Sequence, residues 1–334
     1  MKIYLGGHNA RAPLHNASSQ LVAGAEISLT NAFLAAGIEI CDRLSDADAL
    51  VLIDMDINLL QYARKSENSE IPIILVRNET NVIWPDNYNS KAISLTSKLI
   101  EVGRHGGNTN FNVPWPQDWS QNLEFREVAT TRSEAIVLVN GNKLSFINGE
   151  MYSLRRECIS NLPNLDLYGT GWNFGVLRKV LIFAEEIRLT VKSGLFPNLA
   201  NSRGWLKRTT NWKGAPKSKL DTLSQYKYSL VIENSVDYMT EKLFDAFFAR
   251  CIPVYVGPSV DKYEIPLNLV VHVDPTLNSI EQGIQIAKNM DYEQWRTSLN
   301  AWLSSDAVSN KWSATNVYDA IAREVSNFIL NYQK

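Results

Sequence analysis

The sequence predicts an α/β protein with two domains. Short apolar runs alternate with helical patterns in the first half of the chain, and a similar alternation begins again near residue 134. Residues 226–258 have the pattern of a strand, a helix and a second strand. At 334 residues with 45% hydrophobic content, the chain is long enough to form two separate cores.

The first domain is expected at residues 1–125. Apolar runs at residues 2–5, 49–53 and 71–76 predict strands, and residues 21–36 predict a helix. Residues 103–122 are rich in Asn, Pro, Trp and Gly and predict a long loop. The domain boundary is therefore expected near residues 120–135.

The second domain is expected at residues 126–315, with strands at 134–139 and 165–168 and a helix at 152–162. The apolar runs at 228–232 and 252–256 suit strands that are buried on both faces. Between them, apolar residues at helical spacing follow Thr240, a suitable N-cap, and predict a helix of roughly three turns. A right-handed crossover of this kind makes the two strands parallel. Residues 280–332 are predicted to be helical.

Polar residues gather in the loop that leaves the strand at 228–232. In an open parallel sheet this loop lies at the carboxyl edge, where α/β proteins bind ligands. The start of the next helix offers free N–H groups and the charge of Lys242, which favour a diphosphate. An ordinary unit with a solvated loop would have the same spacing. The loop residues are Glu233, Asn234, Ser235, Asp237 and Tyr238.

The residues ENSVDYMTEK, followed by an apolar helix and IPVYVGP, resemble the donor-binding signature of family 10 glycosyltransferases, the α-1,3/α-1,4-fucosyltransferases. The resemblance implies a GT-B fold, with two Rossmann-like domains facing each other across a cleft and a terminal helix at 316–334 that packs on the N-terminal domain. It implies that the N-terminal domain binds the acceptor and that the C-terminal domain binds GDP-fucose, with no metal or other cofactor. The positions to which it assigns donor binding are Lys227, Glu233, Asn234, Ser235, Tyr238, Thr240, Glu241 and Lys242, and Pro253, Gly257 and Pro258 extend the match.

Arg155 and Arg156 stand at a position similar to that of the family's arginine that contacts the donor pyrophosphate. The spacing to Leu162 favours Arg155, but the adjacency of the two arginines leaves the choice open. An arginine there would neutralise the charge that develops on the leaving GDP. A surface arginine pair beside Glu157 is the alternative.

Glu79 is the candidate for the catalytic base. An inverting transfer needs a group that accepts the proton of the acceptor hydroxyl during its attack on the sugar. Glu79 follows the strand at 71–76 and resembles a family pattern in which a glutamate precedes a proline-containing loop. A solvated loop glutamate is the alternative.

Two other motifs have simpler explanations. Asp54 and Asp56 form the Asp-x-Asp pattern with which GT-A glycosyltransferases hold a metal, but their distance from the donor signature favours an acidic loop or a helix cap. Gly169, Gly171 and Gly175 miss the dinucleotide fingerprint by one residue, so a tight turn from strand to helix is expected. The four histidines lack metal-ligand spacing, and no Walker A pattern is present.

Composition indicates a soluble enzyme. A formal net charge of −2 and a pI near 6.1 give no bulk attraction to nucleic acid or anionic lipid, although local basic patches stay open. Cys41, Cys158 and Cys251 lie far apart in apolar surroundings, as expected of free thiols in a reducing compartment. No apolar stretch suits a signal peptide or a membrane span. We therefore expect a cytoplasmic protein that is a bacterial or phage-like member of the family. Peripheral contact with a membrane is an alternative that the composition does not decide.

The sequence thus predicts an inverting transferase that moves L-fucose from GDP-fucose to a hydroxyl of a glycan acceptor. One alternative is a GT-B transferase that uses another nucleotide sugar. Another is a non-catalytic protein that binds a nucleotide sugar or a glycan. The acceptor, the linkage and the oligomeric state are not predicted, because acceptor loops vary independently of a donor site.

Overall fold

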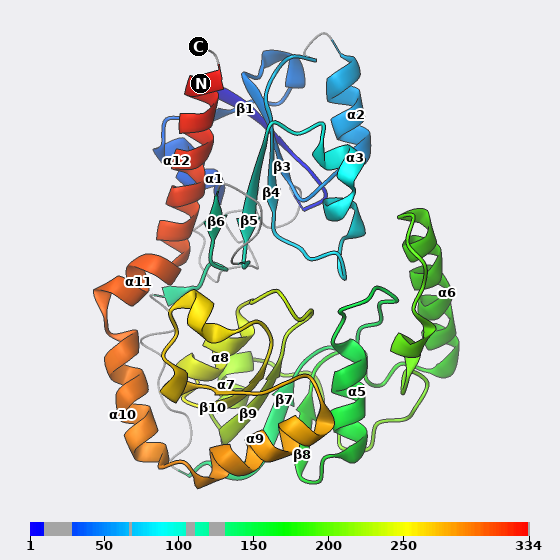
Figure 1. Cartoon of the computed structure of the whole chain (residues 1–334), viewed down its shortest axis with the longest axis vertical. Helices are drawn as coiled ribbons and strands as arrows, with labels where there is room; N and C mark the ends of the chain where they lie inside the picture. Colours follow the sequence, from blue (N-terminus) through cyan, green and yellow to red (C-terminus); the bar gives the residue numbers. More distant parts are fainter. Residues whose placement is uncertain (10–28, 67–68, 105–110, 120–130, 333–334) are drawn as a thin grey trace. The chain divides into compact units, whose positions relative to one another are not determined.

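The computed structural model describes residues 1–9, 29–66, 69–104, 111–119 and 131–332. The chain divides into two compact units (Figure 1). Unit 1 comprises Met1–Gln121 and Asp306–Lys334, and unit 2 comprises Asn122–Ser305. The predicted boundary at 125/126 lies outside the described residues. The predicted return to the first domain at 316 lies later than the structural one, because the helix that begins at Asp306 already belongs to unit 1.

Unit 1 is built on a parallel sheet of six described strands in the order β2-β1-β3-β4-β5-β6. The central strands β3 and β4 are buried at every residue, as the continuous apolar runs predicted. The predicted helix at 21–36 is present at its end, and its first part lies outside the described residues. The strands are β1 (Lys2–Gly6), β2 (Glu39–Ile40), β3 (Ala49–Ile53), β4 (Ile73–Arg77), β5 (Lys98–Val102) and β6 (Asn112–Val113).

Helices lie on both sides of this sheet (Figure 1). On one side, Leu50 and Leu75 of the sheet pack against Leu60 and Ala63 of α2. On the other side, α1 packs against α12. The described helices of unit 1 are α1 (Leu29–Ala35), α2 (Ile57–Lys65), α3 (Ser90–Ile93), α11 (Asp306–Trp312) and α12 (Ala314–Tyr332), with short 3-10 helices η1 (Leu44–Asp46) and η2 (Pro85–Tyr88).

Unit 2 contains a parallel sheet of five described strands in the order β11-β10-β9-β7-β8. The strands are β7 (Ser133–Val139), β8 (Leu165–Tyr168), β9 (Tyr226–Ile232), β10 (Ile252–Val256) and β11 (Val271–His272). The α-helices are α5 (Tyr152–Asn161), α6 (Val176–Lys192), α7 (Lys219–Leu223), α8 (Lys242–Phe248), α9 (Leu277–Asn289) and α10 (Tyr292–Leu303). The 3-10 helices are η3 (Leu199–Ser202), η4 (Val260–Tyr263) and η5 (Leu267–Leu269).

The predicted strand, helix and strand unit is confirmed as β9, α8 and β10, and the two strands are parallel neighbours. Two details of the prediction are wrong. Helix α8 has seven residues, about two turns instead of three. Its N-cap is Glu241 without a side-chain cap, and Thr240 does not cap it because the Thr240 hydroxyl donates to the buried carboxylate of Glu233.

No helix in the described parts of the chain combines the length and the apolar character that crossing a membrane requires.

Candidate functional site

The candidate site lies at the carboxyl edge of the unit 2 sheet, where β7 and β9 are neighbours. From β7 the chain continues to β8 on one side, whereas β9 lies on the other side, so the strand order reverses here. Open α/β sheets bind ligands at such a point. The loops that follow the two strands are joined, because the Met151 N–H donates to the Asn234 carbonyl at 3.1 Å and Glu150 pairs with Ser235 in an isolated bridge.

Glu233 fastens the β9 loop to the start of α8. Its side chain is fully buried, and its Oε1 accepts from the Thr240 N–H at 3.0 Å. Its Oε2 accepts from the Thr240 hydroxyl at 2.7 Å and from Lys242 Nζ at 3.4 Å. A buried carboxylate is tolerated only when it is paired and hydrogen-bonded in this way. The buried Glu233 side chain therefore stabilises the conformation of the loop.

Lys242 lies at the surface of the same network. Its ammonium group donates to the Thr240 hydroxyl at 2.7 Å, and its side chain is 13% exposed. The chain of contacts runs from Lys242 through Thr240 to Glu233. Lys242 is thereby fixed at the first turn of α8, where its charge adds to that of the helix N-terminus.

Glu241 lies between two lysines. Lys219 Nζ and Lys242 Nζ are 3.5 Å and 3.7 Å from the same oxygen, Glu241 Oε1. Burial opposes ionisation of Glu241, but the charges of Lys242 and Lys219 dominate and lower its pKa to about 2. Because the Glu241 side chain is 39% exposed, this cluster of two ammonium groups around one carboxylate is accessible to a ligand.

Lys219 was missed by the sequence interpretation. It begins α7, a helix of five residues, and it also forms an ion pair with Asp245 of α8. No motif surrounds Lys219, and a helix this short has no recognisable periodicity. Only the packing of α7 against α8 brings Lys219 to the donor signature.

Arg155 is buried beneath the β9 loop and forms hydrogen bonds to its backbone. It is 2% exposed, and its Nη2 donates to the carbonyls of Ile232 and Glu233, both at 2.7 Å. The same nitrogen donates to Asn234 Oδ1 at 3.1 Å. Burial lowers the pKa of Arg155. In this structure Arg155 braces the loop that carries the signature.

Arg156 points to a different part of unit 2. Its Nε donates to the Arg203 carbonyl at 2.9 Å and its Nη1 to the Lys143 carbonyl at 2.7 Å. Arg156 also lines a polar cavity of about 250 Å³ together with Lys207 and Arg208. The structure thus separates the two neighbouring arginines, and only Arg155 contacts the β9 loop.

Lys227 is not brought to the site. It lies near the amino end of β9, where its Nζ donates to Glu134 Oε1 at 2.5 Å. At about 3.3 Å per residue, the length of the strand separates it from the loop at the carboxyl end by roughly 20 Å. Lys227 instead helps to fix β9 to β7.

The remaining predicted donor residues are internal to the loop. The Ser235 hydroxyl donates to Asp237 Oδ1 at 3.0 Å, and Tyr238 is 1% exposed. Gly257, after β10, is required by space, because a Cβ there would lie 2.4 Å from Tyr255 Oη and 2.9 Å from Glu233 Cγ. Much of the signature therefore specifies the shape of the loop, while Glu241, Lys242 and Lys219 form a charged cluster at its surface.

Glu79 belongs to unit 1, in the loop after β4, and is half-buried. Its N–H donates to Asp54 Oδ1 at 2.9 Å, and its carbonyl accepts from Asn87 Nδ2 at 2.9 Å. Asn87 Nδ2 also donates to Asp54 Oδ1 at 2.6 Å. The backbone of Glu79 is therefore fixed on both sides.

The Asp-x-Asp motif has structural roles here. Asp54 is fully buried and anchors the Glu79 loop, and burial raises its pKa. Asp56 is the N-cap of α2, as expected, and accepts from the N–H groups of Asn58 and Leu59, both at 3.0 Å. Among the described residues, no group of three or more His, Cys, Asp and Glu side chains is placed to hold a metal ion.

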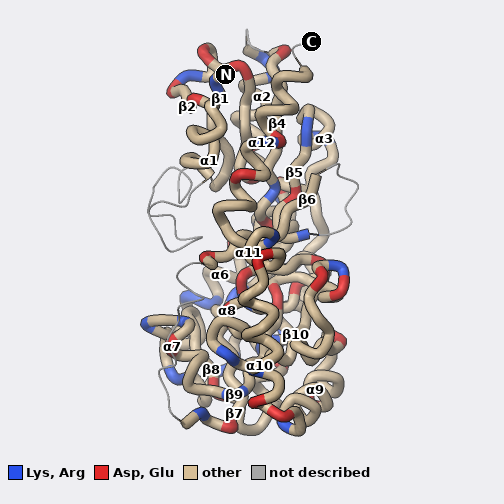
Figure 2. The backbone as a smooth tube through the Cα atoms, turned by 90° about the vertical axis from the view of Figure 1, so that its left-hand side faces the viewer, with Lys and Arg blue, Asp and Glu red and all other residues tan. Residues whose placement is uncertain are grey.

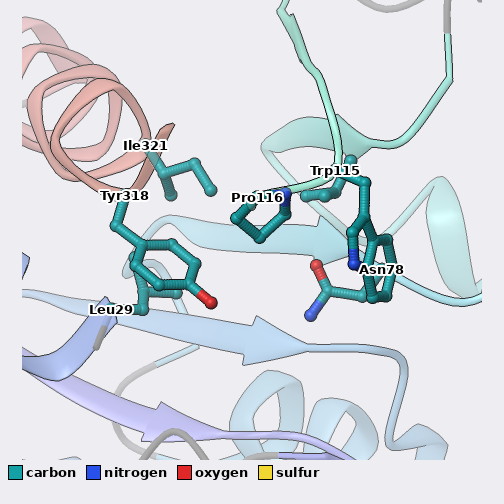
Figure 3. A pocket seen from close by; sticks show the side chains of 7 residues that line it. Leu29, Asn78, Trp115, Pro116, Tyr318 and Ile321 are labelled. Carbon is teal, nitrogen blue, oxygen red and sulfur yellow. The ribbon is translucent and has the colours of Figure 1, made fainter. Parts of the chain in front are cut away.

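A small cavity lies beside the Glu79 loop (Figure 3). Asn78 and Tyr318 face it, and Trp115 and Pro116 close it. Its volume of about 10 Å³ is room for one water molecule and excludes a sugar ring. The buried Tyr318 hydroxyl lacks a hydrogen-bond partner within the described ranges, so a water here would satisfy it.

Comparison with known proteins gives a family match that covers the second half of unit 2 and the first helices after it. Residues 203–320 match the model of the C-terminal domain of glycosyltransferase family 10 (fucosyltransferase). The chain is 38% identical over 92 residues to mouse 4-galactosyl-N-acetylglucosaminide 3-alpha-L-fucosyltransferase 9, which covers 24% of this chain and 25% of that protein. It is 36% identical over 104 residues to bovine alpha-(1,3)-fucosyltransferase 4, covering 26% of each. The chain thus spans about a quarter of the length of the curated relatives it matches.

Solved structures match the whole chain at low identity. A crystal structure of an alpha1,3-fucosyltransferase has a TM-score of 0.54 at 13% identity and covers 99% of this chain and 90% of its own. An alpha-glucosyltransferase in complex with UDP and DNA has a TM-score of 0.52 at 10% identity and covers 99% of this chain and 100% of its own. With its two parallel-sheet α/β domains, the chain therefore has the GT-B fold.

Proposed function

We propose that this chain, whose residues 203–320 match the C-terminal domain of glycosyltransferase family 10, is a fucosyltransferase that transfers L-fucose from GDP-fucose to a hydroxyl of a glycan acceptor. The observation that carries this proposal is the cluster of Lys219, Glu241 and Lys242 at the start of α8. It lies within the family match, at the point where the strand order of the unit 2 sheet reverses.

The two lysines are the proposed diphosphate ligands. Each ammonium group has three N–H donors, and phosphate oxygens accept strongly from charged donors. Glu241 Oε1 lies between the two Nζ atoms and keeps them close together, while Lys219 also pairs with Asp245 and Lys242 with Glu233. A diphosphate would contact the same two ammonium groups, and Glu241 would turn to a hydroxyl of ribose or fucose. Arg155 serves this site as a positioning residue for the loop.

The proposed reaction is a direct displacement. The acceptor oxygen forms a bond to the anomeric carbon of fucose while the bond from that carbon to the GDP oxygen breaks, which inverts the configuration. Glu79 takes the proton of the acceptor hydroxyl, and the electron pair of the broken bond stays on GDP. Lys219 and Lys242 stabilise the charge that develops there. We propose that these two side chains make a divalent metal unnecessary for the reaction.

Two other functions are kept as alternatives. The fold similarity to an alpha-glucosyltransferase in complex with UDP is the reason to test a different nucleotide sugar. A protein that binds the donor without turnover is the second alternative. A cytoplasmic location is part of the proposal and is supported by the three cysteines, all of which are free thiols.

The first experiment is a calorimetric titration of the purified chain with GDP, GDP-fucose and UDP, with and without EDTA. Selective binding of GDP and GDP-fucose that survives EDTA is the expected result. A preference for UDP would reject the fucosyl donor, and binding that EDTA abolishes would reject the metal-free site. A screen of glycan acceptors with GDP-fucose then tests turnover, and binding without transfer to any acceptor would favour the non-catalytic alternative.

A further inference from the structure

Helix α6 carries apolar side chains on two sides but buries only one of them. On the inner side, Ile182, Phe183 and Ile187 pack against a cluster formed by Leu144, Phe146 and Trp205. A helix that is apolar on both sides is normally covered on both. The outer side carries Val176, Leu177, Val180, Leu181 and Val191, which are 66%, 75%, 47%, 63% and 58% exposed. At 3.6 residues per turn, these five side chains fall within about 140° of the helix circumference.

The exposed apolar surface continues after the helix. Phe196 is 97% exposed, and Leu195, Leu199 and Leu206 are 41%, 58% and 57% exposed. Of the 17 large hydrophobic residues exposed in the described part of the chain, nine lie in residues 171–218, about a seventh of the sequence. Single exposed apolar residues need no explanation, but a concentration of this kind indicates an interaction surface.

The same segment is strongly basic. Residues 171–218 contain nine Lys or Arg and two Asp or Glu, although the whole chain has a formal net charge of −2. Figure 2 shows several of these Lys and Arg positions as blue segments of unit 2 around the labels α6 and α7. The side chains of Lys192, Arg203, Lys207, Arg208 and Lys217 are exposed and form no ion pair within the ranges that the structure describes.

Basic and apolar groups adjoin each other at the start of α6. Lys179 Nζ donates to the Lys207 carbonyl at 3.0 Å, which fixes Leu206 and Lys207 beside the first turn of the helix. Lys207 and Arg208 also line the polar cavity of about 250 Å³ that Arg156 lines. An anionic headgroup could therefore be bound next to the place where an acyl chain would meet α6.

We infer that this face of unit 2, named here the α6 surface and formed by the exposed residues of 176–208, docks on a membrane whose lipids carry negative headgroups. An amphipathic helix with basic flanks lies in the plane of such an interface, with its apolar side among the lipids. A second copy of the chain fits less well. A two-fold interface pairs the same patch with itself, so the basic residues would face one another.

The inference goes beyond the proposed transfer and does not depend on it, because the α6 surface contains none of the proposed donor ligands Lys219, Glu241 and Lys242. The test is flotation of the full chain with vesicles of phosphatidylcholine alone and with vesicles that also contain phosphatidylglycerol. We expect binding only to the anionic vesicles and release at high salt. The double changes Leu177→Ser with Leu181→Ser, and Lys207→Glu with Arg208→Glu, should each weaken binding by at least about tenfold.

Helix α9 offers a matched control, because it also exposes an apolar and a basic side chain. The double change Ile286→Ser with Lys288→Glu should leave vesicle binding unchanged. GDP binding by calorimetry and thermal unfolding of every variant show whether unit 2 is still folded, whatever the result for transfer.

Two results would overturn the inference. One is absence of binding to anionic vesicles by the folded wild-type chain, or equal binding by all variants. The other is a stable dimer without lipid, measured by sedimentation, that Leu177→Ser with Leu181→Ser dissociates. That second result would assign the α6 surface to a second copy of the chain.

Discussion

Thr240 connects the two charged groups at the start of α8. Its hydroxyl accepts from Lys242 and donates to Glu233, so one small side chain orients both an accessible ammonium group and a buried carboxylate. A hydroxyl can do this because it has one proton to donate and two lone pairs to accept with. At the residue scale, the candidate donor site is therefore a hydrogen-bonded chain that ends at the surface in Lys242.

Replacing Lys242 with Ala should remove one of the two proposed diphosphate ligands. A hydrogen bond to a charged group contributes about 1.5–3 kcal/mol, so the Kd for GDP-fucose should rise by roughly 10- to 150-fold. Calorimetry measures this directly. Lys262→Ala, at an exposed position on η4, is the control and should bind as the wild type does. An unchanged Kd for Lys242→Ala would remove this side chain from the site.

Glu79→Gln should separate catalysis from donor binding. The amide keeps the size of the side chain but does not accept the proton of the acceptor hydroxyl. We expect kcat to fall by about 10²- to 10⁴-fold, the usual contribution of a general base, with the Kd for GDP-fucose unchanged. Glu70→Gln, at an exposed position before β4, is the control. Transfer at the normal rate by Glu79→Gln would place the base elsewhere.

The depressed pKa of Glu241 predicts how acid affects unit 2. Its pKa of about 2 in the folded chain lies below the ordinary value of 4.5, so its charge stabilises the fold above pH 4.5. This contribution is lost as the pH falls from 4.5 towards 2. The free energy of unfolding of Glu241→Gln, measured in urea, should therefore depend less on pH in this range than that of the wild type. The control Glu281→Gln on α9 should have the same pH dependence as the wild type. Equal pH dependence in all three proteins would contradict the assigned ion pairs.

At the scale of elements, the sequence predicted the strands that are buried on both faces. Residues 49–53 and 252–256 have the same bounds in the structure as in the prediction, because a central parallel strand needs an unbroken apolar run. The edge strands β2, β6 and β11 have two residues each and leave no such pattern. Their place is decided by the neighbouring strand.

The sequence predicted the position of the candidate site but not the direction of its side chains. The signature locates the loop after β9, but a motif does not tell which of its side chains turn inward. Glu233 and Tyr238 are buried, Lys227 lies at the other end of the strand, and Lys219 comes from a separate helix. The burial of Glu233 and Tyr238 and the approach of Lys219 depend on the packing of α7, α8 and β9, which local sequence does not encode, whereas the position of Lys227 before the strand at 228–232 follows from the sequence itself.

At Gly257, directly after β10, the backbone and the packing leave no space for a side chain. Gly257→Ala would place a Cβ within 2.6 Å of Tyr255 Cζ, a ring atom that the core holds in place. We expect a loss of about 1–3 kcal/mol in the free energy of unfolding, as is usual for overpacking, with weaker GDP binding because Glu233 is displaced. Gly175→Ala, where a Cβ meets nothing within 4 Å, is the matched control and should unfold as the wild type does. Equal stability of the two variants in urea would contradict this packing.

At the scale of the whole molecule, the chain leaves unit 1 once and returns once. Unit 2 is a continuous insertion, Asn122–Ser305, and unit 1 is completed by the helices that follow Asp306. Unit 2 has its own sheet of five described strands, and the proposed donor-site residues Lys219, Glu233, Glu241 and Lys242 all lie in it.

This organisation predicts that the fragment 122–305 folds alone and binds GDP. A unit with its own core and with continuous chain is able to fold independently. We expect helical circular dichroism, one cooperative thermal transition that GDP raises, and a Kd for GDP within about threefold of that of the full chain. The same fragment should have no transferase activity, since Glu79 lies in unit 1. GDP should raise the melting temperature of the Lys242→Ala fragment less than that of the unchanged fragment at the same GDP concentration. A folded fragment that fails to bind GDP, while the full chain binds it, would mean that unit 1 supplies part of the donor site.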